Sequence, residues 1–339
     1  MRKLLIICVA VLQVLLLAFM AGQREYVLRT GRTIYLRTVP VDPRDFFRGD
    51  YVSLRYEISS VGNKYFRDGL ATEAKDTDSR RYKGRPVYVV LKVDDSNLAD
   101  IDYITDKKPH DGKLYIRGRR SYSYDRSINV LYGIEAYFVE QGKGEQLERR
   151  RFNAPDEAAV SLEMKVALGG NGIAVLNGYR RPPVAIKMEN IEPKKGAIQS
   201  CRLKLINISD KPVAILDLPD NGSLKLEIDL RRWYQGGNLR WANDDVLPKT
   251  VEDKDVHILL PKQSYEFNIN FNDPYWSVIE KEGEPIPINQ LKLTGWKSPY
   301  FNLVYQPPSK EQCKVLKDAD LIWHGKAVSN SFQGNTGQD

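Results

Sequence analysis

Histidine and cysteine are scarce in this chain, and the familiar motifs of hydrolases and metal sites are missing. Only three histidines (His110, His257 and His324) and three cysteines occur among its 339 residues. Nucleophilic catalysis needs a base beside the nucleophile, and no G-x-S-x-G sequence is present. HExxH, CxxC and EF-hand patterns are also absent. We therefore expect neither a conventional hydrolase nor a metal or cofactor site.

The chain also lacks the signatures of nucleic-acid-binding proteins. It carries a net charge of +7 and has an isoelectric point near 9.0, but its basic residues are spread along the chain rather than gathered in one arm. No finger, RRM-like or helix-turn-helix pattern accompanies them. The positive charge favours an anionic membrane surface or an acidic polymer, and we expect no nucleic-acid partner.

The N-terminus is the one long apolar run. Arg2 and Lys3 precede a segment from Leu4 to Gly22 that is apolar apart from Gln13, about the length needed to cross a bilayer as a helix. At the end of this segment, Phe19-Met20-Ala21 places a large residue at a position where signal peptidase needs a small one. We therefore expect residues 1–23 to be an uncleaved anchor, with a cleaved signal peptide as the alternative. The positive-inside rule places the following residues outside the cytoplasmic membrane, in the periplasm or outside the cell.

A turn followed by a strand organises the next part of the chain, between Thr38 and Ser59. Two prolines, several aspartates and Gly49 indicate a turn. Strict alternation begins at Tyr51, so that Val52, Leu54, Tyr56 and Ile58 share one face of a strand. We expect Leu54 and Tyr56 to be buried and Tyr51 to lie on the opposite face.

These residues resemble a known bacterial family. The sequence Gly49-Asp50-Tyr51-x-x-Leu54-x-Tyr56 matches the motif that names the GDYXXLXY protein family, and residues 132–142 resemble its second recurring segment. The resemblance covers residues 24–186. It implies an anchored envelope protein, often encoded beside multi-pass membrane proteins, but no established activity or catalytic residues.

Short alternating stretches predict an all-β first domain over residues 24–186, either a barrel or a sandwich. We expect a hairpin around Thr30-Gly31-Arg32, further strands at 86–93, 113–120 and 129–139, and a hairpin over 163–176. Residues 65–83 and 94–112 are polar and read as loops, and residues 142–151 as a short helix.

The remaining sequence predicts a second β domain over residues 187–331. It alternates at 200–208, 224–230, 265–271 and 300–305, and its proline turns and last strands weakly resemble bacterial immunoglobulin-like sandwiches. Residues 332–339 are rich in Gly, Asn and Gln and read as a disordered tail.

The richest candidate binding site is a charged rim beside the motif strand, formed by Asp42, Arg44, Asp45, Arg48 and Asp50. A turn needs one Asp and one Gly, whereas this turn carries three Asp and two Arg, and Arg suits recognition of carboxylate or phosphate. The structural interpretation assigns the same charges to the turn, and gives Gly49, Tyr51, Leu54 and Tyr56 packing roles.

Two other features have weaker functional interpretations. Trp233 and Tyr234 precede a Gly pair and could stack on sugar rings, although aromatic residues mostly fill cores. Acidic groups at Asp94-Asp95, Asp100 and Asp102, and at Asp244-Asp245, could hold Ca²⁺, but solvated surface loops are commonly acidic.

The two cysteines outside the anchor, Cys201 and Cys313, form an even pair. In an oxidising compartment they would form a disulfide; two buried free thiols are the alternative.

Together these observations predict a membrane-anchored envelope protein. We expect a non-enzymatic binding or scaffold subunit for an integral membrane partner. The alternatives are a protein that binds envelope glycan and a glycan-active enzyme that works through carboxylates.

Overall fold

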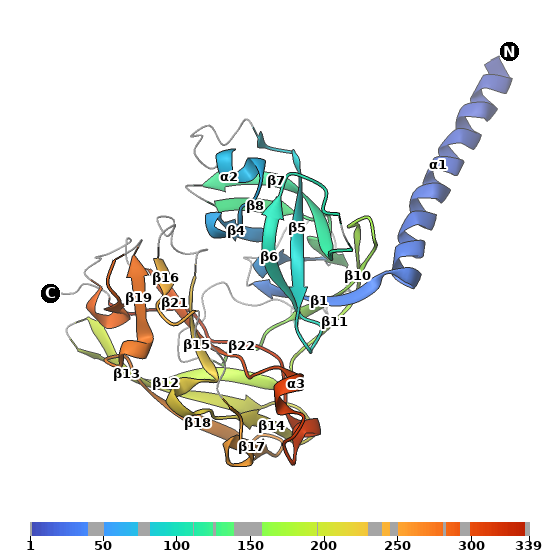
Figure 1. The fold of residues 1–339 in the computed structure, drawn as a ribbon. Helices are drawn as coiled ribbons and strands as arrows, with labels where there is room; N and C mark the ends of the chain where they lie inside the picture. The colour runs from blue at the N-terminus through green and yellow to red at the C-terminus, as the bar shows by residue number, and fades with distance from the viewer. Residues whose placement is uncertain are drawn as a thin grey trace.

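The computed structural model describes residues 2–39, 51–73, 82–110, 112–124, 127–138, 158–194, 196–229, 239–244, 250–280, 283–291 and 299–335. The protein is mostly β, as the sequence predicts, with one long N-terminal helix and several sheets. Figure 1 shows this helix projecting from one β unit, while a second β unit lies below the first.

Helix α1 spans Arg2–Thr30 and is longer than the sequence indicated. The expected hairpin around Gly31 is wrong, because Tyr26, Val27 and Leu28 belong to the last turns of α1 rather than to a strand. The Gly31 N–H donates to the Val27 carbonyl (2.8 Å) and closes the helix. A Cβ at Gly31 would lie 2.5 Å from that carbonyl oxygen, so glycine permits the chain to pass directly from helix to strand.

The first β unit comprises the described residues between 32 and 180. Its elements are β1 (Arg32–Val39), β2 (Tyr51–Ser53), β3 (Arg55–Tyr56), η1 (Glu57–Ser59), β4 (Ser60–Gly62), η2 (Asn63–Tyr65), α2 (Gly69–Glu73), β5 (Pro86–Val93), β6 (Ala99–Thr105), β7 (Tyr115–Tyr124), β8 (Ser127–Leu131), β9 (Ala136–Phe138), β10 (Glu163–Leu168) and β11 (Ala174–Arg180). Sheets β11-β10-β1-β3 and β4-β8-β7-β5-β6 nearly close into a barrel. A parallel bridge between Tyr35 and Leu98 joins them.

The motif strand has the alternation expected from its sequence. Val52, Leu54, Tyr56 and Ile58 are all buried in the core of the first β unit, whereas Ser53 and Arg55 are exposed. The strand is broken at Leu54, whose N–H donates to the Glu135 carbonyl (2.7 Å) instead of continuing one ladder. The expected burial of Leu54 and Tyr56 is confirmed.

The second β unit comprises the described residues between 184 and 335. Its elements are β12 (Val184–Lys194), β13 (Ala197–Asn207), β14 (Val213–Leu216), η5 (Pro219–Asn221), β15 (Leu224–Ile228), β16 (Leu239–Trp241), η6 (Asp253–Asp255), β17 (Val256–Leu259), β18 (Ser264–Asn270), η7 (Pro274–Trp276), β19 (Ser277–Glu280), β20 (Ile286–Pro287), η8 (Ile288–Gln290), β21 (Tyr300–Tyr305), α3 (Lys310–Cys313), η10 (Ala319–Leu321), β22 (Ala327–Val328) and β23 (Phe332–Gln333). Sheets β12-β13-β18 and β15-β21-β22 contribute to one hydrophobic core. The immunoglobulin-like topology and the domain limits stay predictions.

The cysteines correct another expectation. All three lie among the described residues, and each is a free thiol. Cys201 belongs to the main core of the second unit, whereas Cys313 packs in a separate cluster with Leu216 and Leu316. The predicted disulfide is therefore not formed, because the two thiols are buried in different hydrophobic clusters.

Three further segments differ from the sequence-based expectation. Residues 99–105, taken as part of a polar loop, form β6. The expected long strand over 129–139 is divided into β8 and β9, with Gly133 between them at φ 80°. Phe332 and Gln333, assigned to the tail, form β23 and pair with β21. The expected helix at 142–151 lies outside the described residues.

The two units are connected by more than one crossing of the chain. Ala159 pairs with Ile186 of β12 and belongs to the second core, while Leu162, three residues later, belongs to the first core. The chain then returns from β11 to β12 at residue 184. Side-chain contacts add to this: Arg37 of β1 donates to the Lys326 carbonyl (2.7 Å), and the Lys310 N–H donates to Asp95 (2.5 Å).

Candidate functional site

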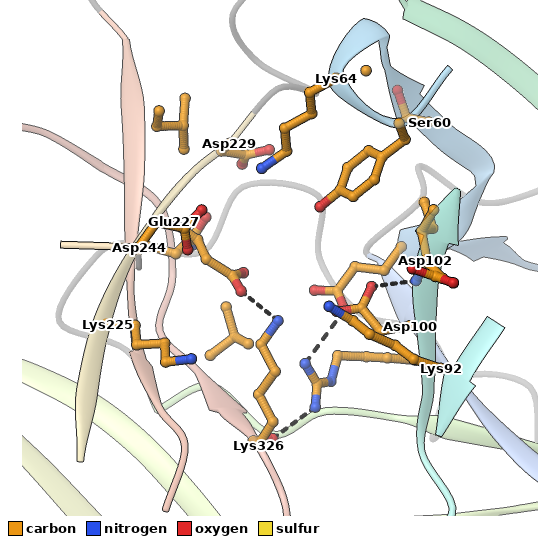
Figure 2. A pocket seen from close by; sticks show the side chains of 18 of the residues that line it. Ser60, Lys64, Lys92, Asp100, Asp102, Lys225, Glu227, Asp229, Asp244 and Lys326 are labelled. Atoms are coloured by element: carbon orange, nitrogen blue, oxygen red, sulfur yellow. Dashed lines mark hydrogen bonds and ion pairs between the residues drawn. The ribbon is translucent and has the colours of Figure 1, made fainter. Parts of the chain in front are cut away.

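A polar cleft of about 900 Å³ lies between the two β units. One wall comes from β4, η2, β5, β6 and β8 of the first unit, and the other from β15, β16, β21 and β22 of the second. Figure 2 shows charged side chains of both signs extending into this space from both walls. The volume is within the range of pockets that take small-molecule ligands.

The charged residues of the first wall lie on the paired strands β5 and β6. Lys92 and Asp100 are direct cross-strand partners, and Asp102 follows two residues later on the same face of β6. Leu91, Ile101 and Ile104 are buried in the core of this unit. Asp100 and Asp102 flank the buried Ile101, and an irregularity in the β5–β6 register beside Asp102 allows Ile104 to be buried as well. The acidic residues of β6 therefore line the cleft, while its isoleucines pack in the core of the first unit.

The second wall is built in the same way on β15. Lys225 and Glu227 alternate with the buried Leu224 and Leu226, and Asp229 follows directly after the strand. The apolar residues of β15 pack in the core of the second unit. All three charged residues line the cleft.

Lys326 is a buried cation at the centre of the cleft (Figure 2). Its ammonium group lies 2.5 Å from a Glu227 carboxylate oxygen. Burial alone would lower the pKa of Lys326, but the carboxylates of Glu227, Glu57 and Asp100 outweigh burial and raise it. Lys326 is therefore a fixed positive charge at any physiological pH.

Arg37 connects this region to a buried ion-pair network. Its guanidinium lies 3.3 Å from Glu57 and 3.7 Å from Glu163, whose side chain is 2% exposed. Arg180 pairs with the same Glu163 at 2.7 Å and covers the Tyr35 ring. Arg37 is itself buried, and its Nε lacks a hydrogen-bond partner. The network joins β1, β10 and β11 beneath the cleft and reaches the second unit through the Lys326 carbonyl.

Lys225 differs from these paired cations. Its ammonium has no hydrogen bond or ion pair with any residue that the structure describes. Burial lowers the pKa of Lys225; the carboxylates of Asp244 and Glu227 oppose this effect, and the nearby charges of Lys326 and Lys92 add to it. Lys225 is thus a half-buried cation whose charge is incompletely balanced.

Carboxylates of both walls affect the pKa of Tyr65. Burial raises the pKa of its phenol, and the carboxylates of Asp100, Glu227 and Asp244 raise it further. Asp100 belongs to the first unit, and the other two carboxylates belong to the second. The Tyr65 hydroxyl is therefore a neutral hydrogen-bond donor close to acidic groups of both units.

Most residues proposed from the sequence as a site cannot be placed. The rim residues Asp42, Arg44, Asp45, Arg48 and Asp50 lie outside the described residues, as do Gly49, Trp233, Tyr234 and the side chain of Tyr51. Asp94 is described and lines the cleft, and it accepts hydrogen bonds from the Ser96 and Leu98 N–H groups. This pattern is a structural turn. Among the described residues, no group of three or more His, Cys, Asp or Glu is placed to hold a metal ion.

The two sequence segments that carried the family resemblance meet in the first β unit. The Tyr56 hydroxyl donates to the Ile134 carbonyl (2.6 Å), and the Tyr132 hydroxyl donates to the Ile58 carbonyl (2.5 Å). The two rings contact each other edge to face, 6.4 Å apart. Strand β2 also pairs with β9. We call the reciprocal pair of hydroxyl contacts the tyrosine clamp; it explains structurally why the two segments occur together.

Sequence reasoning overlooked the cleft, although one signal for it was present. The stretch LKLEIDL was correctly predicted as a strand, and its polar positions are all charged (Lys225, Glu227 and Asp229). A strand with charges of both signs on one face needs opposing charges or solvent. Nothing in the sequence, however, indicates that the facing wall contains Lys92 and Asp100.

The structure thus defines a class: a β protein of two packed units that carries one long apolar N-terminal helix. Residues 13–178 match the family model described as GDYXXLXY protein. The match confirms that this segment of the chain resembles the GDYXXLXY protein family, as its motif indicated. Comparison with curated proteins gave no significant match, and comparison with solved structures gave none either.

Proposed function

We propose that this chain is a membrane-anchored, non-enzymatic binding or scaffold subunit of a bacterial cell envelope, and that its first β unit contacts an integral membrane protein. The observation that carries the proposal is the exposure of α1. The helix is long and apolar enough to cross a membrane, and none of its apolar window is buried against the rest of the protein. A large apolar surface is unfavourable in water, and a bilayer would cover it.

The charges around α1 support one orientation. Arg2 and Lys3 precede the apolar segment, and the positive-inside rule assigns them to the cytoplasmic side. Both β units would then lie in the periplasm or outside the cell. The mature protein keeps the helix as its anchor in this proposal.

The junction between helix and barrel supports a contact close to the bilayer. Only Gly31 separates α1 from β1. Val27 is 3% exposed, and the end of α1 packs against β10 and β11. The first unit is therefore held beside the bilayer, within reach of another membrane protein.

Site-specific photo-crosslinking in native membranes tests the partner. Phe138 is 77% exposed on β9, beside the motif strand, and Val315 is 88% exposed on the second unit. A crosslinking amino acid at position 138 should give a discrete adduct with an integral membrane protein, whereas position 315 serves as the matched control. Absence of an adduct from position 138, or an identical adduct pattern at 315, contradicts a specific contact through the first unit.

Protease added to spheroplasts tests the topology independently. Both β units should be digested before lysis, leaving a fragment that contains α1. Survival of the intact chain until lysis contradicts the proposed orientation.

A glycan-active enzyme, or a protein that binds glycan in the cleft, is a second candidate, and the carboxylates of the cleft favour it. Asp100 and Asp102 extend from one wall and Glu227 and Asp244 from the other (Figure 2), which is the type of pair that glycoside hydrolysis uses. Release of reducing ends from cell-wall glycan by the wild type, lost in both Asp102→Asn and Asp244→Asn, would support the enzyme. Equal activity in all three proteins would exclude a role for these carboxylates.

A further inference from the structure

We propose that the cleft binds a phosphorylated polyol or sugar, with the phosphate between Lys92 and Lys225 and the hydroxyl groups on the carboxylates around them. This site goes beyond the membrane contact proposed above, because it lies between the two β units rather than at the end of α1. It would bridge the first unit to the second through the ligand.

The positions of three lysines carry the inference. Lys92 belongs to β5 of the first unit, and Lys225 belongs to β15 of the second. Figure 2 shows them on opposite sides of the cleft with Lys326 between them. Both Lys326 and Lys92 are close enough to Lys225 to disfavour its charged form. Three ammonium groups from two walls therefore share one space.

Only one of these three cations is neutralised by an ion pair within the described residues. Lys326 is paired with Glu227 at 2.5 Å. Neither Lys92 nor Lys225 has a hydrogen bond or ion pair in the described parts of the chain. An anion placed between them would reduce their repulsion and gain two charge-assisted hydrogen bonds.

Phosphate fits this arrangement better than carboxylate does. Its oxygens point in several directions and can accept from two separate point charges on opposite walls, as lysine provides. A carboxylate presents two coplanar oxygens, for which the planar fork of arginine is the matching donor. Four arginines also line the cleft, and each already has a partner. Arg37 donates to Glu57 and to the Lys326 carbonyl. Arg55 donates to Asn129, and Arg67 donates to the Phe66 carbonyl.

The acidic residues determine what the rest of the ligand must be. Asp102 and Asp244 line opposite walls of the cleft, and both are exposed and without hydrogen-bond partners in the described structure. Ionised carboxylates only accept hydrogen bonds, so they would repel a second anionic group and bind hydroxyl donors. A phosphate attached to a polyol or sugar supplies both features.

Calorimetric titration of the full-length protein in detergent tests the inference. The probes are glycerol 3-phosphate, inorganic phosphate and glycerol. We expect glycerol 3-phosphate to bind more tightly than inorganic phosphate, glycerol not to bind, and affinity to fall as salt concentration rises. Lys92→Gln and Lys225→Gln should each weaken glycerol 3-phosphate binding at least tenfold, and Lys225→Arg should retain most of it.

Lys211→Gln provides the matched control, because Lys211 is exposed in a turn of the second unit and does not line the cleft. It should bind as the wild type does, and all variants should melt within a few degrees of each other. The phosphate site is refuted if the wild type does not bind, or if Lys92→Gln and Lys225→Gln both bind normally. It is also refuted if Lys211→Gln weakens binding equally. Equal binding of inorganic phosphate and glycerol 3-phosphate refutes the polyol part. Because purified protein is used, these outcomes are independent of the membrane-partner experiment.

Discussion

The tyrosine clamp should contribute measurably to folding stability, and two single substitutions isolate its hydroxyl groups. Tyr56→Phe removes the donor to the Ile134 carbonyl, and Tyr132→Phe removes the donor to the Ile58 carbonyl. Both substitutions keep the rings and their edge-to-face contact. The change is therefore confined to one hydrogen bond in each variant.

The burial of these two tyrosines determines how much free energy of unfolding each variant should lose. Tyr56 is 1% exposed and Tyr132 is 7% exposed, so water cannot readily replace the lost donor. A buried carbonyl left without its partner costs about 1–3 kcal/mol, and we expect each variant to lose that much free energy of unfolding. Because both bonds join the same two segments, the double variant should lose less than the sum, by about 0.5 kcal/mol or more.

Urea denaturation of the full-length protein in detergent, followed by circular dichroism, measures these differences. Burial raises the pKa of both phenols, so the hydroxyls remain protonated donors throughout the neutral range. Tyr103→Phe is the control, because the Tyr103 hydroxyl makes only an exposed contact with Lys113. It should change stability by less than about 0.5 kcal/mol. If Tyr56→Phe and Tyr132→Phe match this control, the clamp does not stabilise the motif.

Four further predictions follow from the structure. Leu54→Ala should cost about 2–5 kcal/mol by opening a cavity; a loss as small as that of a surface substitution would contradict the burial of Leu54. Arg37→Met should cost about 1–3 kcal/mol, because it leaves the Lys326 carbonyl without its donor while Glu163 keeps Arg180 at 2.7 Å. Arg202→Met, which breaks an exposed pair, should cost about 0–1 kcal/mol. Burial lowers the folded-state pKa of Lys225 below its ordinary value, so the unfolded chain binds more protons at this group and the contribution of Lys225 to stability rises as the pH rises through the folded-state pKa. The difference in stability between the wild type and Lys225→Met should therefore change with pH in this range, and identical pH profiles of the two proteins would contradict the shift. Thiol labelling of unreduced, denatured protein should detect three free cysteines per chain. Detection of a single reactive thiol would instead indicate that Cys201 and Cys313 form a disulfide.

Local patterning predicted much of the β structure. The alternation at residues 51–58 correctly identified the buried face, because one side chain in two must enter the barrel core. The same period identified β13, β15, β18 and β21 of the second unit. The residues of the predicted motif rim lie outside those described.

The errors have identifiable physical causes. Tyr26 and Val27 have side chains that favour strands, yet α1 continues through them because each residue added to an existing helix gains one more hydrogen bond. Strand β6 was missed because its aspartates suggested a loop, although Ile101 and Ile104 are buried. The disulfide argument used cysteine number and compartment, which carry no information on the separate clusters that hold Cys201 and Cys313.

The cleft could not be predicted from local sequence patterns, because its two walls come from distant parts of the chain. Lys92 and Lys225 line the same cleft only because the two β units pack against each other. Their sequence neighbours specify that each lies on the polar face of a strand, but not which face of the other unit it meets.

The absence of a linker between α1 and β1 has a mechanical consequence. A helix of 29 residues is about 43 Å long, and Gly31 alone separates it from a strand that is hydrogen-bonded on both sides. A tilt of this helix would therefore tilt the first β unit with it. If α1 spans a bilayer as proposed, a change in bilayer thickness or in a neighbouring membrane helix would rotate the mouth of the cleft relative to the membrane surface. The orientation of the proposed binding site would then depend on the state of the membrane.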